Sequence, residues 1–239
     1  GDPVQFFDRT FITRGLKYLL TQTLQRVNGV GGEPVIDLMT TFGGGKTHSE
    51  IAVFHLVGGT PVEALSGIEE LCASAGADGV PERVHRAVIV GNDLSVLGQT
   101  KPDGTEVRTM WGELAYQLGG TKGYDLVKRF DEAGTPPPTS DIAALLEKYS
   151  PCVILIDEWV SYLRQLYSRG SEEPYAAGTF DAHQTWAQSL TEAVKSVNTA
   201  MLVASLPASD SVRDMGEGVI DNGHEVGGTA GLEALRSLR

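Results

Sequence analysis

The chain has 239 residues and a mass of 25.5 kDa, which is enough for one large domain or two small ones. Hydrophobic residues make up 41% and charged residues 21%, so the chain can bury a core and is not intrinsically disordered. Nineteen Lys and Arg against 31 Asp and Glu give a net charge of −12. This balance argues against direct nucleic-acid binding, because phosphate recognition needs clustered cations.

Neither a membrane span nor a secretion leader is visible in the sequence. No stretch approaches the roughly 18 to 20 consecutive apolar residues that a membrane helix needs, and the N-terminus has no basic segment followed by an apolar one. Cys72 and Cys152 are far apart and have neither disulfide nor metal-ligand spacing, which is typical of a reducing compartment. We therefore expect a cytoplasmic protein with no membrane partner.

Helix and strand patterns alternate along the chain, which predicts an α/β fold around a parallel sheet. The expected strands are apolar runs without alternation, as found in strands buried on both faces. The predicted helices lie at residues 11–27 and 46–56, and the predicted strands at 34–41, 84–90, 152–156 and 200–204.

Residues 92–150 are predicted to form a mostly helical insert within a single domain spanning residues 1–239. The turn signal Lys101-Pro-Asp-Gly104 predicts a hairpin over about residues 94–107. The segment is long for a plain connection between strands. Within it, helices are expected near residues 109–119, 124–133 and 140–149, and loops are expected later in the chain at 169–179 and 216–230.

The segment Thr40-Thr-Phe-Gly-Gly-Gly-Lys-Thr47 follows a predicted strand and opens a predicted helix, the context of a phosphate-binding loop. Glycines let successive backbone N–H groups turn toward phosphate oxygens, and the helix N-terminus adds partial positive charge. Lys46 is expected to reach the β- and γ-phosphates, and the Thr47 hydroxyl to ligate Mg²⁺. Thr40 departs from the usual pattern, which opens with glycine. The predicted nucleotide-binding residues are Phe42, Gly43, Gly44, Gly45, Lys46, Thr47 and His48. The alternative for His48, an ordinary helix residue that faces solvent or the core, is the one that the sequence favours.

A second motif is the apolar run Cys152-Val-Ile-Leu-Ile156 followed by Asp157 and Glu158. A buried strand with an acidic tip fits a metal–phosphate site, with Asp157 holding Mg²⁺ through its water shell and Glu158 acting as general base toward water. A third catalytic candidate, Ser205, ends the following strand and is predicted to sense the γ-phosphate, with Ser209 as a substitute. Together these motifs predict a P-loop NTPase, and the two carboxylates favour hydrolysis over phosphoryl transfer to a small molecule.

The chain resembles a family of large bacterial and archaeal ATP-binding proteins that is catalogued as a domain of unknown function. The phrases that carry the resemblance are Phe42-Gly-Gly-Gly-Lys-Thr-His-Ser49, Arg108-Thr-Met-Trp-Gly-Glu-Leu-Ala-Tyr-Gln-Leu-Gly119 and Ile154-Leu-Ile-Asp-Glu-Trp-Val-Ser-Tyr162. Members are often encoded in anti-phage islands, including BREX-type systems. The resemblance implies an additional-strand, AAA+-like core at the N-terminus of a longer chain, with the lid and the arginine-containing segment lying outside this fragment.

The expected activity is ATP binding and Mg²⁺-dependent hydrolysis that drives conformational work in a defence or nucleic-acid-processing machine. The alternative is a scaffold that binds ATP to set its assembly state and hydrolyses little. The preference for adenine rests on the resemblance, and the implied partners are further copies of the chain or other defence-system proteins.

Three further groups of residues keep two interpretations each, and a fourth group has one. Trp111, Glu113, Tyr116 and Gln117 form either a packing face or a docking face, and Asn92 with Asp93 either positions water or caps a loop. Arg164 and Arg169 are either solvated or face a neighbouring subunit. Phe7, Thr10, Phe11 and Arg14 are candidates for the border of the adenine pocket, as the segment before the first strand often is in AAA+ proteins.

Overall fold

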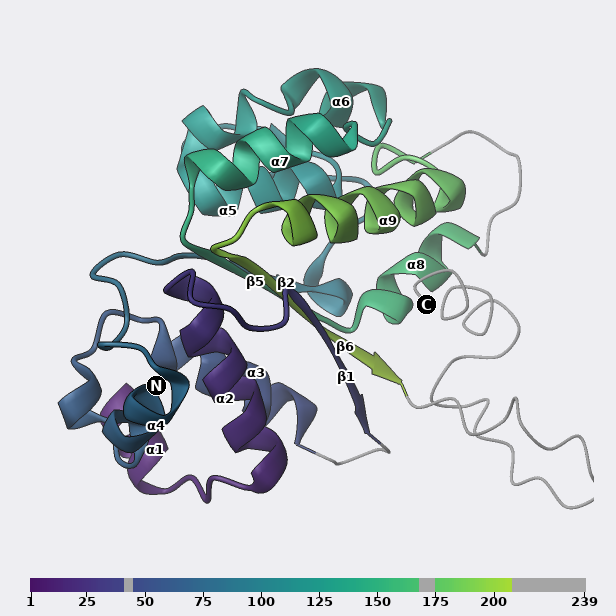
Figure 1. Cartoon of the computed structure of the whole chain (residues 1–239). Coiled ribbons are helices and arrows are strands. Elements are labelled where there is room, and N and C mark those ends of the chain that lie inside the picture. Colours follow the sequence, from purple (N-terminus) through teal and green to yellow (C-terminus); the bar gives the residue numbers. More distant parts are fainter. Residues whose placement is uncertain (41–44, 168–174, 208–239) are drawn as a thin grey trace, which may run out of the picture.

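A computed structural model of the chain describes residues 1–40, 45–167 and 175–207. In this part of the chain, four parallel strands form one sheet in the order β1-β6-β5-β2 (Figure 1). The strands are β1 (Val35–Thr40), β2 (His85–Val90), β5 (Cys152–Asp157) and β6 (Ala200–Pro207). The predicted α/β class and parallel sheet are therefore confirmed. The four predicted strands end within three residues of the observed ones.

Helices cover both faces of the sheet, because each buried strand directs alternate side chains to opposite sides. The N-terminal helices lie on one face and the later helices on the other (Figure 1). The first layer contains α1 (Pro3–Asp8), α2 (Arg14–Val27), α3 (Lys46–Leu56), the 3₁₀ turn η1 (Val62–Ala64) and α4 (Ile68–Ala75). The second contains α5 (Met110–Tyr124), α6 (Lys128–Ala133), α7 (Thr139–Lys148), α8 (Trp159–Tyr167) and α9 (Phe180–Ser196).

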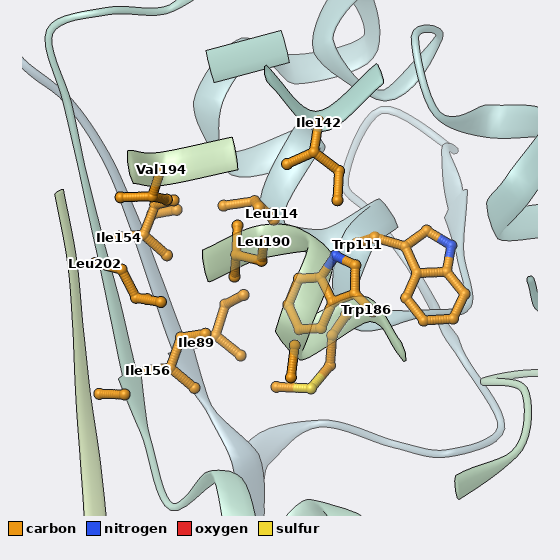
Figure 2. Packing of buried hydrophobic residues seen from close by; sticks show 14 of the residues in the cluster. Ile89, Trp111, Leu114, Ile142, Ile154, Ile156, Trp186, Leu190, Val194 and Leu202 are labelled. Carbon is orange, nitrogen blue, oxygen red and sulfur yellow. The ribbon is translucent and has the colours of Figure 1, made fainter. Parts of the chain in front are cut away.

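The larger of the two cores lies between the sheet and the second helix layer (Figure 2). Ile154 and Ile156 of β5 and Leu202 of β6 face this core, whereas Val153 and Leu155 face the opposite core under α2 and α3. Alternate side chains of β5 therefore pack into the two cores on opposite faces of the sheet. A strand buried in this way presents only its tip to solvent, so its tip is the place where polar chemistry can occur.

The first two helices begin at capping residues rather than at the start of the apolar pattern. The helix predicted at residues 11–27 begins at Arg14. Thr13 is its N-cap, because the Thr13 hydroxyl accepts a hydrogen bond from the Leu16 N–H (3.2 Å). Phe11 therefore lies outside the helix and is 85% exposed. The short helix α1 was not predicted; Asp2 caps it by accepting from the Val4 N–H.

Residues 92–150 contain the predicted hairpin and helices. The strands β3 (Gln99–Thr100) and β4 (Glu106–Val107) pair antiparallel around the 101–104 turn. Helix α5 is longer than predicted and kinks at Gly120 (φ 59°, ψ −148°). It packs along β2, and α7 packs along α9. The segment thus forms much of the second helix layer.

No helix in the described part of the chain is long and apolar enough to cross a membrane.

Candidate functional site

The carboxyl ends of the parallel strands bring the predicted site residues to one edge of the sheet. The register places Ser205 of β6 opposite Leu38 of β1, and Asp157 of β5 opposite Val90 of β2. Ala204 of β6 is opposite Ile156 of β5. The next residues on these strands, Ser205 and Asp157, therefore lie side by side at the carboxyl ends of the two strands. In open parallel sheets this edge is where ligands bind.

The Asp157 carboxylate is the centre of this cluster. Its Oδ2 accepts a hydrogen bond from the Thr47 hydroxyl at 3.0 Å. Its Oδ1 accepts from the Glu158 backbone N–H at 2.9 Å and from the Ser205 hydroxyl. The structure therefore joins three residues that are far apart in sequence, and Thr47 and Asp157 are separated by 110 positions.

Helix α3 begins beside this carboxylate. Gly45 precedes it in the left-handed conformation (φ 79°, ψ 20°), which glycine adopts without a Cβ penalty, and no side chain caps the helix. Lys46 and Thr47 are its first two residues, so the uncapped N–H groups of its first turn are available to an anion. Phe42, Gly43 and Gly44 lie outside the described residues, as does Ser209.

His48 lies on the exposed side of α3 and contacts the N-terminal segment. Its ring packs on Phe6 with 4.7 Å between centroids, and its Nε2 lies 3.3 Å from the Thr10 hydroxyl. Of the residues considered for the adenine border, Phe7 is buried in the core, whereas Phe11 is exposed in the connection before α2. Thr10 therefore lies beside the first turn of α3, Phe7 packs in the core, and Phe11 and Arg14 are exposed.

Glu158 occupies a strained turn between β5 and α8. It is the non-glycine residue with positive φ (56°) among those described, a conformation that costs about 1 kcal/mol or more. A Cβ atom at Gly91 would lie 2.1 Å from the Glu158 carbonyl oxygen, so only glycine fits opposite this turn. The Ser161 hydroxyl donates to the Asn92 side-chain oxygen and fastens α8 to the end of β2. Asn92 is thus engaged by α8, and neither the water-positioning nor the loop-capping interpretation of this residue is tested by the contact.

Glu50 is a member of the cluster that the sequence interpretation missed. It lies on α3 one turn after Lys46, is only 5% exposed, and its Oε1 has no hydrogen-bond partner among the described residues. Burial is the main reason why its pKa rises to about 8; the Asp157 and Glu158 carboxylates add to the rise, and the Lys46 ammonium opposes it. Its spacing of four from Lys46 and three from Thr47 places it on the same helix face, and this was the available signal.

The docking interpretation of the α5 face is wrong. Trp111 and Glu113 are buried, and Glu113 pairs with Lys101 (2.5 Å) inside the segment. The Gln117 amide accepts from the Val88 N–H (2.6 Å) and donates to the Val88 carbonyl (2.8 Å), so it occupies the open edge of β2 like a short strand. This face therefore packs within the chain. Arg164 lies on α8, and Arg169 is outside the described residues.

A groove of about 690 Å³ lies elsewhere, between the edge of β1, β6 and α9. Its described lining includes Val35, Asp37, Trp159, Gln188 and Lys195, and no predicted site residue. Within the same described ranges, no group of three or more His, Cys, Asp or Glu side chains is placed to hold a metal ion. The groove and the carboxyl-edge cluster are thus separate features, and only the second combines a helix N-terminus with converging carboxylates.

Comparison with known proteins matches the chain to a protein family. The family model described as the DUF499 N-terminal domain covers residues 1–222. No curated protein and no solved structure matches the chain. Because the family model spans most of the chain, this protein belongs to the DUF499 N-terminal domain family.

Proposed function

We propose that this chain binds ATP with Mg²⁺ and hydrolyses it, as the N-terminal catalytic module of a longer protein. The observation that carries the proposal is the hydrogen bond between Thr47, at the start of α3, and Asp157, at the tip of β5. A glycine run with lysine and threonine and an acidic strand tip are each common alone. Their meeting at one sheet edge is what a phosphate-binding and metal-binding site requires.

The strand order supports the same proposal. Strand β6 lies between β1, which leads into the glycine run, and β5, which carries the acidic residues. This is the arrangement that an additional-strand, AAA+-like core calls for, and it brings Ser205 beside Asp157. Ser205 is proposed to sense the γ-phosphate. Its hydroxyl contacts the Asp157 carboxylate, so a phosphate or metal ion bound at Asp157 would change that contact.

The residues at this edge fit Mg²⁺, which prefers oxygen ligands and retains several waters. The Thr47 hydroxyl and the Asp157 carboxylate would hold the ion, which neutralises phosphate charge when bound. The backbone N–H groups of the first turn of α3 and the Lys46 ammonium would hold the phosphates. His48 stays a prediction as a nucleotide contact, since its ring already rests on Phe6.

Glu158 is proposed as the general base. It follows the metal-binding residue directly, is exposed to water, and is fixed by its own N–H bond to Asp157. A positioned carboxylate that removes a proton from water typically contributes about 10²- to 10⁴-fold in rate. The strained backbone at this position fits a residue retained for chemistry rather than stability.

A nucleotide-gated scaffold with little turnover is the second candidate. The observation that favours it is Thr40, which stands where the phosphate-loop pattern has glycine. In either case we propose that the module serves an anti-phage or nucleic-acid-processing assembly in the cytoplasm. Further copies of the chain or other proteins of that assembly are its proposed partners.

The test compares ATP affinity and turnover for the parent chain, Lys46→Ala and Glu158→Gln, with the exposed residues Lys17 and Glu70 changed to Ala and Gln as matched controls. Calorimetry in Mg²⁺ measures binding, and phosphate release measures turnover in the chain and in the longer protein. We expect Lys46→Ala to abolish binding. Glu158→Gln should bind ATP and lose at least about 100-fold in turnover.

Each outcome has a distinct meaning. Binding by the parent without turnover, in the longer protein as well, supports the scaffold over the ATPase. Binding that survives Lys46→Ala, or an absence of binding by the parent, refutes the phosphate-loop assignment altogether.

A further inference from the structure

Glu50 on α3 carries a buried carboxyl group, one oxygen of which has no hydrogen-bond partner among the described residues, close to the predicted metal site. Glu50 is 5% exposed, and the oxygen without a partner in this part of the chain is Oε1. The residues that follow it on α3, Ala52, Val53 and Leu56, belong to the hydrophobic core. An apolar side chain would suit this position, because a buried polar group without a partner destabilises a fold.

The surroundings of Glu50 make its presence more costly. The Glu50 carboxyl group shares a hydrogen bond with the Asp157 carboxyl group, and it is close enough to Glu158 and Lys46 to interact with the charge of each. Three carboxyl groups therefore share the region with one lysine. Burying a carboxyl group costs desolvation free energy that its unpartnered oxygen does not recover, so the packing alone gives no reason for Glu50.

Helix geometry directs Glu50 toward the site. Side chains on a helix lean toward its N-terminus, so a residue covers the turn that precedes it. The turn before Glu50 carries Lys46 and Thr47, and Thr47 donates to Asp157. This lean agrees with the hydrogen bond between the buried Glu50 carboxyl group and the Asp157 carboxyl group.

We propose that Glu50 is a positioning residue of the metal site, which fixes the Asp157 carboxyl group and thereby the affinity for the divalent cation. This inference rests on the proposed function. Groups that orient metal ligands typically contribute about 10- to 100-fold to metal affinity. Glu50 acts through Asp157 and needs no contact with the nucleotide.

The test uses the full chain with the non-hydrolysable ATP analogue AMPPNP, and measures Mn²⁺ affinity by electron paramagnetic resonance. Glu50→Met removes the carboxyl group and keeps the volume, whereas Glu50→Gln keeps a group that hydrogen-bonds to Asp157. AMPPNP affinity in EDTA and the melting temperature are measured for both. Glu70→Met, an exposed change on α4, is the control.

We expect Glu50→Met to lower Mn²⁺ affinity about 10- to 100-fold, with an unchanged or higher melting temperature and unchanged AMPPNP binding in EDTA. Glu50→Gln should recover most of the affinity. The inference is overturned if Glu50→Met binds Mn²⁺ like the parent, if it unfolds, or if Glu50→Gln falls equally far. If the parent itself does not bind AMPPNP, the proposed function fails and the inference fails with it; if the parent binds, only the inference is at stake.

Discussion

The buried imidazole of His183 makes the stability of this protein sensitive to mild acid. His183 lies on α9 with no exposed surface, and its ring packs against Trp111, Tyr162 and Trp186. Its Nε2 is 2.8 Å from the Ala177 carbonyl, to which it donates in the neutral form, and its Nδ1 is buried without a partner among the described residues. A second proton would therefore have no acceptor, and burial lowers the pKa of His183 to about 4.

The size of the effect follows from the two pKa values. The unfolded chain takes up its proton near pH 6.5, and the folded chain only near pH 4. Between these values the unfolded state binds more protons, so the free energy of unfolding falls as the pH falls. The contribution is intact above about pH 6.5, and the loss between pH 7 and pH 5 is about 2 kcal/mol.

Urea unfolding of the parent and of His183→Gln at pH 7, 6 and 5 measures this contribution. Other titrating groups are common to both proteins, so they cancel in the difference. We expect the parent to lose about 2 kcal/mol more than the variant between pH 7 and pH 5. Parallel stability curves would refute the reasoning, because they would mean that the folded protein accommodates the charged ring.

Four further predictions concern single residues. Gly91→Ala should lower the free energy of unfolding by about 1 to 3 kcal/mol and reduce turnover, since the added Cβ meets the Glu158 carbonyl. Gly15→Ala in α2 should stabilise the chain by about 0.5 to 1 kcal/mol, because nothing lies within 4 Å of its Cβ; equal melting temperatures for these two variants would contradict the prediction. Arg26→Met should cost about 3 kcal/mol in urea unfolding, because three carbonyls around the end of α9 lose their donor. Asp131→Asn should cost about 2 kcal/mol in the same assay, because four donor hydrogen bonds converge on this carboxylate; a loss below 1 kcal/mol for either variant would count against the assigned contacts.

The features that sequence reasoning predicted well are the local ones. An apolar run that ends in Asp157 and Glu158 indicates a strand whose tip is exposed, and the run of residues 152–157 is a strand. A glycine run before Lys46 predicts a helix that begins there, and α3 does so. In both cases the signal lies within ten residues, where backbone propensity and turn chemistry decide the structure.

The features that were missed depend on partners distant in sequence. The Gln117 amide covers the edge of β2 because the fold brings α5 alongside that strand. The sequence around residue 117 contains no pattern that predicts this contact. Helix α4 was not predicted, although Gly67 and Gly76 in the left-handed conformation mark its two ends. Glu50 follows the polar residues that begin α3, where a charged side chain ordinarily faces solvent, so its burial became visible only with the fold.

The buried charged groups of this chain differ in how well they are paired, and the difference distinguishes structural from functional roles. Arg26 donates to three carbonyls, and Asp131 accepts from four donors, so both groups are well compensated where they lie. Glu50 is buried with an unpartnered oxygen beside like charges, and Glu158 keeps a backbone conformation that glycine would adopt more easily. Natural sequences keep such departures from local stability mainly where chemistry requires them. Both departures lie at the carboxyl edge of the sheet, which is the physical reason for proposing the chemistry there rather than in the groove beside α9.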